Sequence, residues 1–129
     1  MDARALVTAA AAAAHTARWD DVLVLARAAI AVDARSARAW SLAGLALEQL
    51  GDLAQARVSL ERAVSLDDRD LPTALAAARV QAKTGARSAA RALANYVLLH
   101  EDNAPALRTE AQALMRALDE TSTGADGRG

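Results

Sequence analysis

The chain repeats at an interval of 34 residues. A shift by this interval superimposes residues of the same size class over almost the whole sequence. The aligned sets are Ala9, Ala43 and Ala77; Ala10, Gly44 and Ala78; Ala17, Gly51 and Gly85; Val22, Ala56 and Ala90; Ala29, Ala63 and Val97; Ile30, Val64 and Leu98; and Asp33, Asp67 and Glu101. A constant interval of this length indicates a stack of structural units, in which each unit buries its apolar face against the next.

Composition makes the unit helical. Hydrophobic residues are 53% of the chain and aromatic residues 2%, and alanine accounts for much of the difference. Alanine loses no side-chain entropy in a helix, whereas the residues that favour sheets are scarce. The pattern predicts helices over 2–16, 19–33, 37–50, 53–66, 71–84 and 87–100. Gly51 and Gly85 fall at helix ends in the left-handed conformation, and Gly44 marks a close approach of two helices.

The period and the small residues resemble the tetratricopeptide repeat (TPR), whose pattern is W-x2-L-G-x2-Y, then A-x3-F, then P. The middle copy matches best, through Trp40, Gly44, Leu47, Gly51, Ala56, Leu60 and Ala63. It departs at Ala43, Leu60 and Asp68, where leucine, phenylalanine and proline are usual. The third copy departs at Ala74, Gln81 and Arg87. The resemblance implies an all-α, right-handed superhelical stack of three helix pairs, over about 3–36, 37–70 and 71–104.

A seventh helix is predicted over about 105–119. Pro105 suits its first turn, because the missing amide hydrogen would be unpaired there in any case. One face is apolar, with Leu107, Ala111, Leu114 and Leu118, and the opposite face is polar. A terminal helix with one polar, solvent-exposed face is typical of the cap of a repeat stack. We therefore expect a single domain over 1–119 and a disordered tail over 120–129, whose residues offer too little apolar surface to order the chain.

Charge and cysteine content exclude several classes of function. There are 15 basic and 16 acidic residues and no cysteine. The balance gives no sign of nucleic-acid binding, and the absence of cysteine excludes disulfides and thiolate metal sites, which fits a cytoplasmic protein. The apolar run over 5–14 is far shorter than the ~20 residues that span a bilayer. It keeps the repeat register, so we expect a helix and not a secretion signal.

Catalytic and metal-binding constellations are absent from the sequence. His15 and His100 lie at non-equivalent repeat positions, and we expect His15 to end the first helix and His100 to be partly buried at a helix end. The acidic residues at the turns are expected to cap helices: Asp67, Asp68, Asp70, Glu101 and Asp102. Trp19 and Trp40 are expected in the core. We therefore predict no enzyme activity, no cofactor and no metal.

The TPR resemblance implies a concave groove that is lined mainly by the first helix of each repeat and binds a polypeptide. The residues at the inward positions are Arg4, Val7, Ala11, Arg38, Ser41, Leu45, Glu48, Leu75, Arg79 and Ala82, with Ala14 beside them. Leu45 and Leu75 are expected to be exposed there. The positions that hold lysine and asparagine in the repeats that grip the carboxylate end of heat-shock chaperones are Val7, Ala11, Leu42, Pro72 and Ala76 here. That clamp is absent, so the resemblance implies apolar anchoring with arginines at the margins.

A narrower resemblance is to the translocator chaperones of type III secretion, which share the layout of three repeats and one capping helix. The stretches that carry it are LDDRDLP over 66–72, AAA over 76–78, KTG over 83–85 and the helix over 105–118. Such proteins hold an unfolded secretion substrate and often dimerise. Three interpretations therefore stay open: an adaptor or assembly scaffold, a chaperone of this type, and a self-assembling oligomer such as a homodimer.

Overall fold

The computed structural model describes residues 1–102 and 104–127, and this part of the chain forms seven α-helices and no strand. The helices are α1 (Ala3–His15), α2 (Trp19–Val32), α3 (Ala37–Gln49), α4 (Leu53–Leu66), α5 (Leu71–Lys83), α6 (Arg87–His100) and α7 (Pro105–Gly127). The first six lie within a residue of their predicted bounds at each end. The 34-residue period is therefore one helix pair with its two turns.

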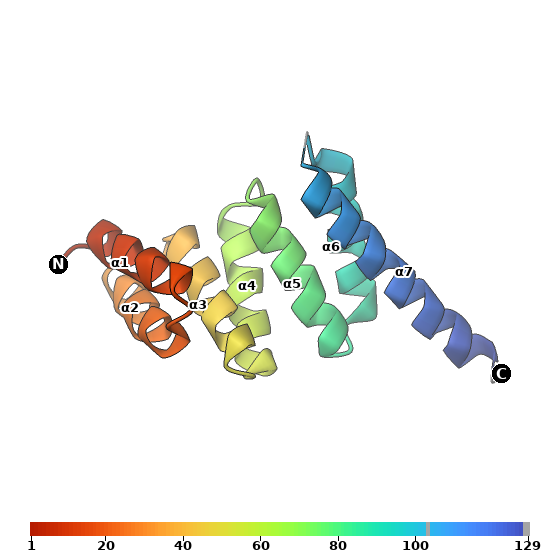
Figure 1. Ribbon diagram of the computed structural model, residues 1–129, viewed down its shortest axis with the longest axis horizontal. Coiled ribbons are helices and arrows are strands. Elements are labelled where there is room, and N and C mark those ends of the chain that lie inside the picture. Colours follow the sequence, from red (N-terminus) through yellow and green to blue (C-terminus); the bar gives the residue numbers. More distant parts are fainter. Residues whose placement is uncertain (103, 128–129) are drawn as a thin grey trace.

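The helices pack in chain order as three pairs followed by a final helix (Figure 1). Each helix contacts the next, and α1, α3, α5 and α7 also contact one another in succession. The first helices of the pairs therefore form one continuous layer. The second helices, α2, α4 and α6, have no such mutual contacts, so they lie on the other side of the stack.

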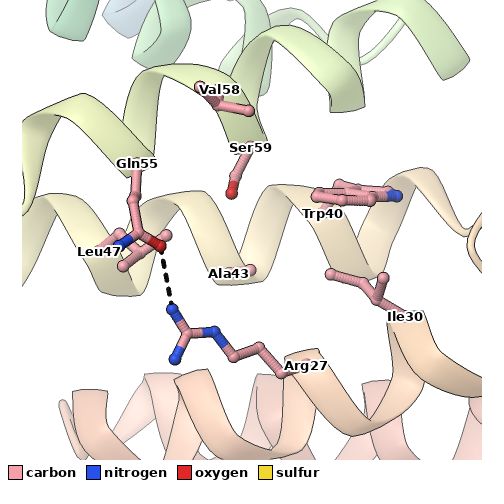
Figure 2. Close-up of a pocket in the computed structure, with 8 residues that line it drawn as sticks. All are labelled: Arg27, Ile30, Trp40, Ala43, Leu47, Gln55, Val58 and Ser59. Atoms are coloured by element: carbon pink, nitrogen blue, oxygen red, sulfur yellow. Dashed lines mark hydrogen bonds between the residues drawn. The ribbon is translucent and has the colours of Figure 1, made fainter.

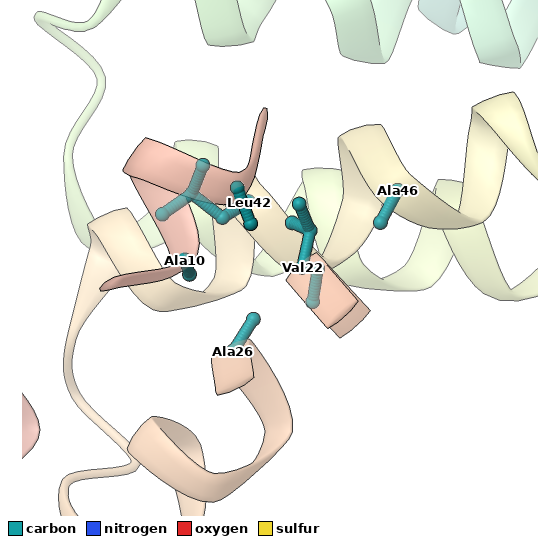
Figure 3. Close-up of a cluster of buried hydrophobic side chains, with 7 residues drawn as sticks. Ala10, Val22, Ala26, Leu42 and Ala46 are labelled. Atoms are coloured by element: carbon teal, nitrogen blue, oxygen red, sulfur yellow. The ribbon is translucent and has the colours of Figure 1, made fainter. Parts of the chain in front are cut away.

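Small side chains let the helices approach closely. The first of three apolar clusters is built largely from alanine, with Val22 and Leu42 as its larger buried members (Figure 3). At the contact of α3 with α4, a Cβ atom on Gly44 would lie 2.5 Å from Cγ of Leu60. Leu60 is completely buried. The expectation that Gly44 marks a close helix contact is thus confirmed.

Each of the three pairs turns in the same way between its helices. Gly51 and Gly85 have φ values of +89° and +88°, as the sequence predicts for glycines that end helices. Ala17, at the equivalent place in the first pair, also has a positive φ of 55°. In all three turns, the residue after the one with positive φ donates its amide hydrogen to the carbonyl five residues before it. An example is Arg18 N to Ala13 O at 3.0 Å. Ala17 therefore adopts a conformation that glycine would adopt at lower cost.

Acidic residues cap the helices that follow the turns. Asp70 accepts a hydrogen bond from the amide of Thr73, and Asp52 caps α4 in the same way. Asp67 accepts from the amide of Arg69 within its own turn, and Glu101 accepts from the amide of Ala104 ahead of α7. The prediction that the turn acids cap helices is confirmed for Asp70, whereas Asp67 and Glu101 bond amides within their own turns.

The final helix lies against α5 and α6. Ala111 and Leu118 on its apolar stripe are buried, whereas the opposite face is exposed. Arg87 on α6 donates to the carbonyl of Leu118 at 3.0 Å, and Arg91 pairs with Asp119. The helix continues to Gly127, beyond the predicted end near 119. The division into repeats and the disorder proposed for 120–129 stay predictions, and residues 128 and 129 lie outside the described part of the chain.

Two expectations about side chains outside the predicted groove are wrong. His100 ends α6 but is exposed, with Nδ1 2.9 Å from the carbonyl oxygen of Tyr96 and its ring stacked on the Tyr96 ring. Trp40 is only partly buried and lines a surface pocket, and its indole Nε1 donates to the carbonyl of Ala34 at 2.8 Å. Trp19 packs against the first core cluster, and His15 ends α1 as expected.

Candidate functional site

The predicted groove residues all lie on α1, α3 and α5, the layer of first helices. We call this set the inner face: Arg4, Val7, Ala11, Arg38, Ser41, Leu45, Glu48, Leu75, Arg79 and Ala82. Arg4 and Arg38 are exposed, and neither forms an ion pair within the described residues. Val7, Ala11, Leu45, Arg79 and Ala82 are partly buried, whereas Ser41, Glu48 and Leu75 are buried. The inner face is therefore less open than the sequence suggests.

The expectation that Leu75 is exposed is wrong. Its exposed fraction is 2%, and it belongs to a core cluster against which Leu107 and Leu114 of α7 pack. Ser41, one period earlier, is buried between α3 and α5, where its hydroxyl lies 2.7 Å from that of Thr73. This repeat position points toward the next first helix along the layer. In each pair, the side chain at this repeat position is therefore covered by the first helix of the next pair. In the last pair, α7 takes that place and covers Leu75.

Leu45 differs from Leu75 in keeping some exposure. It is partly buried against the second core cluster, which includes Leu47, Leu60 and Val80. Its position in the repeat is one turn further along the helix than that of Ser41. Leu45 is thus the apolar inner-face residue of α3 that remains partly open to a partner.

A charged network crosses the inner face at its C-terminal half. The guanidinium of Arg79 on α5 donates two hydrogen bonds to Glu48 on α3, at 2.7 and 2.8 Å, and a third to Glu110 on α7 at 2.7 Å. Nζ of Lys83 lies 3.5 Å from the same Glu48 carboxylate. Two-point contacts of this kind fix geometry as well as adding energy. The network ties α3, α5 and α7 together.

Burial raises the pKa of Glu48, but hydrogen bonds and charge from Arg79 and Lys83 outweigh it, so the pKa lies below its ordinary value. The hydrogen bond to Glu48 in turn raises the pKa of Arg79. Only 4% of the Glu48 side chain is exposed, whereas 32% of the Arg79 side chain is. Both groups are therefore charged at neutral pH, and Arg79 presents its remaining surface to solvent.

A pocket of about 240 Å³ lies between α5 and α7 at the edge of the inner face. Apolar surface comes from Ala82, Leu114 and Leu118, and cationic groups come from Arg79, Lys83 and Arg87. A second, adjoining pocket is lined by Arg79, Glu110, Ala113 and Leu114. Sequence reasoning included Ala82 and Arg79 in the groove but not the residues from α7. The apolar stripe of α7 was visible in the sequence, although its packing against α5 was not.

The described residues offer neither a cluster of metal ligands nor a membrane span. Within 1–102 and 104–127, no three histidine, cysteine, aspartate or glutamate side chains gather closely enough to hold a metal ion. No helix in the same part of the chain is both long and apolar enough to span a bilayer.

Three helix pairs with left-handed turn residues, closely packed small positions and a layer of successive first helices define a TPR fold. Comparison with solved structures supports this assignment. The chain superimposes on the first TPR domain of Spaghetti (RPAP3) bound to the HSP90 peptide SRMEEVD, with a TM-score of 0.84, 16% identity, and 95% and 94% of the two chains covered.

Two further matches are secretion chaperones. The type III secretion translocator chaperone SycD of Yersinia enterocolitica matches with a TM-score of 0.83 and 15% identity, over 93% of this chain and 85% of that one. PcrH of Pseudomonas aeruginosa, in complex with the chaperone-binding region of PopD, matches with a TM-score of 0.81 and 20% identity over 92% of each chain. No protein-family model matches the sequence, and no curated protein matches it significantly. At these identities the likeness establishes the fold.

Proposed function

We propose that this protein is a binding module that holds a segment of another polypeptide on its inner face and carries out no chemistry. The observation that supports the proposal most directly is the apolar pocket between α5 and α7, which opens beside Arg79, Lys83 and Arg87. Pockets that combine apolar walls with a few placed polar groups are typical of binding sites. The pocket is part of the layer formed by α1, α3, α5 and α7, so a bound segment could extend from it along the other first helices.

The chemistry of the inner face specifies the partner. Val7, Ala11, Leu45 and Ala82 offer modest apolar surface, so small apolar side chains fit better than large aromatic ones. Arg4 and Arg38 are exposed cations without an acidic partner within the described residues. An extended or helical segment with apolar anchors and flanking acidic residues complements this arrangement. The cysteine-free composition fits a reducing cytoplasm.

The test is a pull-down from the native host with wild type and two matched variants. Leu45→Glu places a charge on the inner face and should abolish capture of the partner. Leu99→Glu is the control, because Leu99 lies on α6, away from the inner face, and is 72% exposed. It should capture the partner as wild type does.

Thermal melting of both variants completes the test. Leu45 is only partly buried, so Leu45→Glu should lower the melting temperature by no more than a few degrees. Undiminished capture by folded Leu45→Glu protein would show that the partner binds elsewhere. A collapse of this variant would show that Leu45 belongs to the core, and an Ala82→Gln variant that fills the pocket beside α7 would then decide the question.

A chaperone for a secretion substrate is the second candidate. It is favoured by the matches to SycD and PcrH, which extend over nearly the whole chain. Under this hypothesis the bound segment comes from an unfolded, partly hydrophobic export substrate. Secretion genes beside this gene, and stabilisation of one of their products on co-expression, are expected. Their absence would favour a general adaptor.

Self-association is a third candidate, favoured by exposed valines on α2, with Val24 68% and Val32 59% exposed. A homodimer through this helix would bury them. Light scattering at several concentrations separates the two cases: a mass that rises with concentration supports an oligomer, and a constant mass of about 13.4 kDa supports a monomeric receptor.

A further inference from the structure

A separate pocket, of about 300 Å³, lies between α2, α3 and α4 (Figure 2). Its walls are mostly apolar and its polar groups are few. The lining residues are Arg27, Ile30, Trp40, Ala43, Leu47, Gln55, Val58 and Ser59. An engineered apolar cavity of ~150 Å³ binds benzene. This pocket has about twice that volume, so it has room for a ligand larger than benzene.

The pocket lies on the opposite side of α3 from the inner face. Successive helical residues are roughly 100° apart around the axis, so Trp40, Ala43 and Leu47 point about half a turn away from Arg38 and Leu45. The other two walls come from α2 and α4, which belong to the second helices of their pairs. This site is therefore separate from the one proposed above.

Ser59 breaks the repeat pattern at this pocket. It is 7% exposed, and its hydroxyl points into the pocket without a hydrogen-bond partner among the described residues. The residues 34 positions before and after it are Leu25 and Leu93, and both pack against core clusters. The fold thus accommodates leucine at this position. Serine instead leaves the space open and places a hydrogen-bond donor and acceptor in the pocket wall.

Arg27 places a cation at the mouth. Its Nη2 donates to Oε1 of Gln55 at 3.2 Å, and its guanidinium has no carboxylate partner among the described residues. The equivalent residues in the next two pairs are Glu61 and Asn95. Most of the guanidinium donors of Arg27 therefore stay available to an anion. The equivalent positions in the other two pairs hold no cation, so this arrangement is specific to the contact of the first pair with the second.

From this geometry we infer that the pocket between α2, α3 and α4 binds a carboxylate that carries an apolar group of about phenylalkyl size. The apolar group packs on Ile30, Leu47 and the Trp40 ring, and the carboxylate accepts hydrogen bonds from Arg27 and Ser59. Charge-assisted hydrogen bonds in a largely apolar pocket are strong enough to select the acid over its neutral amide.

Fluorescence of Trp40 provides a direct assay, with Trp19→Phe removing the second indole. The probes are 4-phenylbutyrate and its uncharged analogue 4-phenylbutyramide. The acid should give a saturable change, and the amide should bind at least tenfold more weakly. Equal affinity of the two probes, or no saturation by the acid in the millimolar range, would overturn the inference.

Three variants locate the site. Ser59→Leu should abolish binding while raising the melting temperature, because leucine already occupies the equivalent positions in the first and third pairs. Arg27→Gln should weaken binding of the acid about tenfold, whereas Arg62→Gln, which removes an exposed arginine elsewhere on α4, should leave it unchanged. Unaltered binding by folded Arg27→Gln and Ser59→Leu proteins would contradict the assignment.

A blocked dipeptide, N-acetyl-phenylalanyl-aspartate amide, distinguishes the source of the ligand. Tighter binding of the dipeptide supports a protein segment, and tighter binding of the free acid supports a small metabolite. Leu45→Glu should bind either probe like the parent protein. This control separates the pocket from the inner face, so either proposal can fail without the other.

Discussion

The close contact of α3 with α4 gives a quantitative test of the fold. In Gly44→Ala, the new Cβ atom would lie 2.5 Å from Cγ and 2.6 Å from Cδ2 of Leu60, and 3.2 Å from the Leu60 amide nitrogen. Carbon atoms in contact are normally at least ~3.5 Å apart. Leu60 is completely buried in the second core cluster, so moving its side chain displaces other buried side chains. The helices must separate or Leu60 must leave its rotamer.

Two opposing terms set the magnitude. Replacing a mid-helix glycine by alanine gains about 0.5–1 kcal/mol of helix stability. Overpacking of a well-filled contact costs about 1–3 kcal/mol. The net change should be a loss of about 1–2 kcal/mol for alanine and several kcal/mol for leucine. For a domain of this size each kcal/mol lowers Tm by about 3–6 °C.

A double-mutant cycle with Leu60→Ala isolates the contact. Leu60→Ala alone should cost about 2–5 kcal/mol, because it empties a buried site. In that background Gly44→Ala should become neutral or stabilising, since the atoms it would strike are gone, and the coupling should be about 1–3 kcal/mol. Denaturant unfolding of the four proteins measures it. A Gly44→Ala protein as stable as wild type, or additive losses, would refute the packing argument.

Three further predictions concern the turns, the charged network and the core. Ala17→Gly should stabilise the protein by about 1 kcal/mol, because Ala17 has a positive φ. Gly85→Ala should destabilise it by a similar amount through backbone strain alone, since the new Cβ would meet nothing within 4 Å. Denaturant unfolding checks both. The pKa of Glu48 is lowered in the folded state, so its stabilising contribution is complete above the unfolded pKa of about 4.3 and is lost as the pH falls through the lower folded value. Glu48→Gln should therefore flatten the loss of stability below about pH 4.3 in acid unfolding. Leu75→Glu should unfold the protein, as circular dichroism would show, because it buries a charge under α7.

The helices and their close contacts were predictable from the sequence for a physical reason. A 34-residue period repeats the same steric requirements, so Gly44, Gly51 and Gly85 each mark a place where only a small or left-handed residue fits. The rule for Gly51 and Gly85 depends on the local backbone, and the rule for Gly44 depends on the other helix of its own pair. They do not need knowledge of what lies across the stack.

The charged network and the burial of Leu75 could not be predicted in this way. Glu48, Arg79 and Glu110 are 31 residues apart in succession, so their meeting depends on how the first helices are displaced along one another. Leu75 occupies an inward position by repeat logic, but α7 covers it. The pocket at Ser59 did leave a signal, since serine stands where the aligned repeats have leucine. Its significance required the structure.

The final helix shapes the inner face as much as it caps the stack. It buries Leu75, forms one wall of the pocket beside Ala82 and supplies Glu110 to Arg79. A partner carboxylate that approaches Arg79 therefore meets a guanidinium in which all three nitrogens already donate, Nε and Nη2 to Glu48 and Nη1 to Glu110. Glu110 is half exposed and Glu48 almost fully buried, so Glu110 is the bond that a partner can replace at low cost. Under the proposed function, recognition at this pocket would therefore couple the partner's acidic groups to the position of α7, and the partner's apolar groups would bind a surface that α5 and α7 create together.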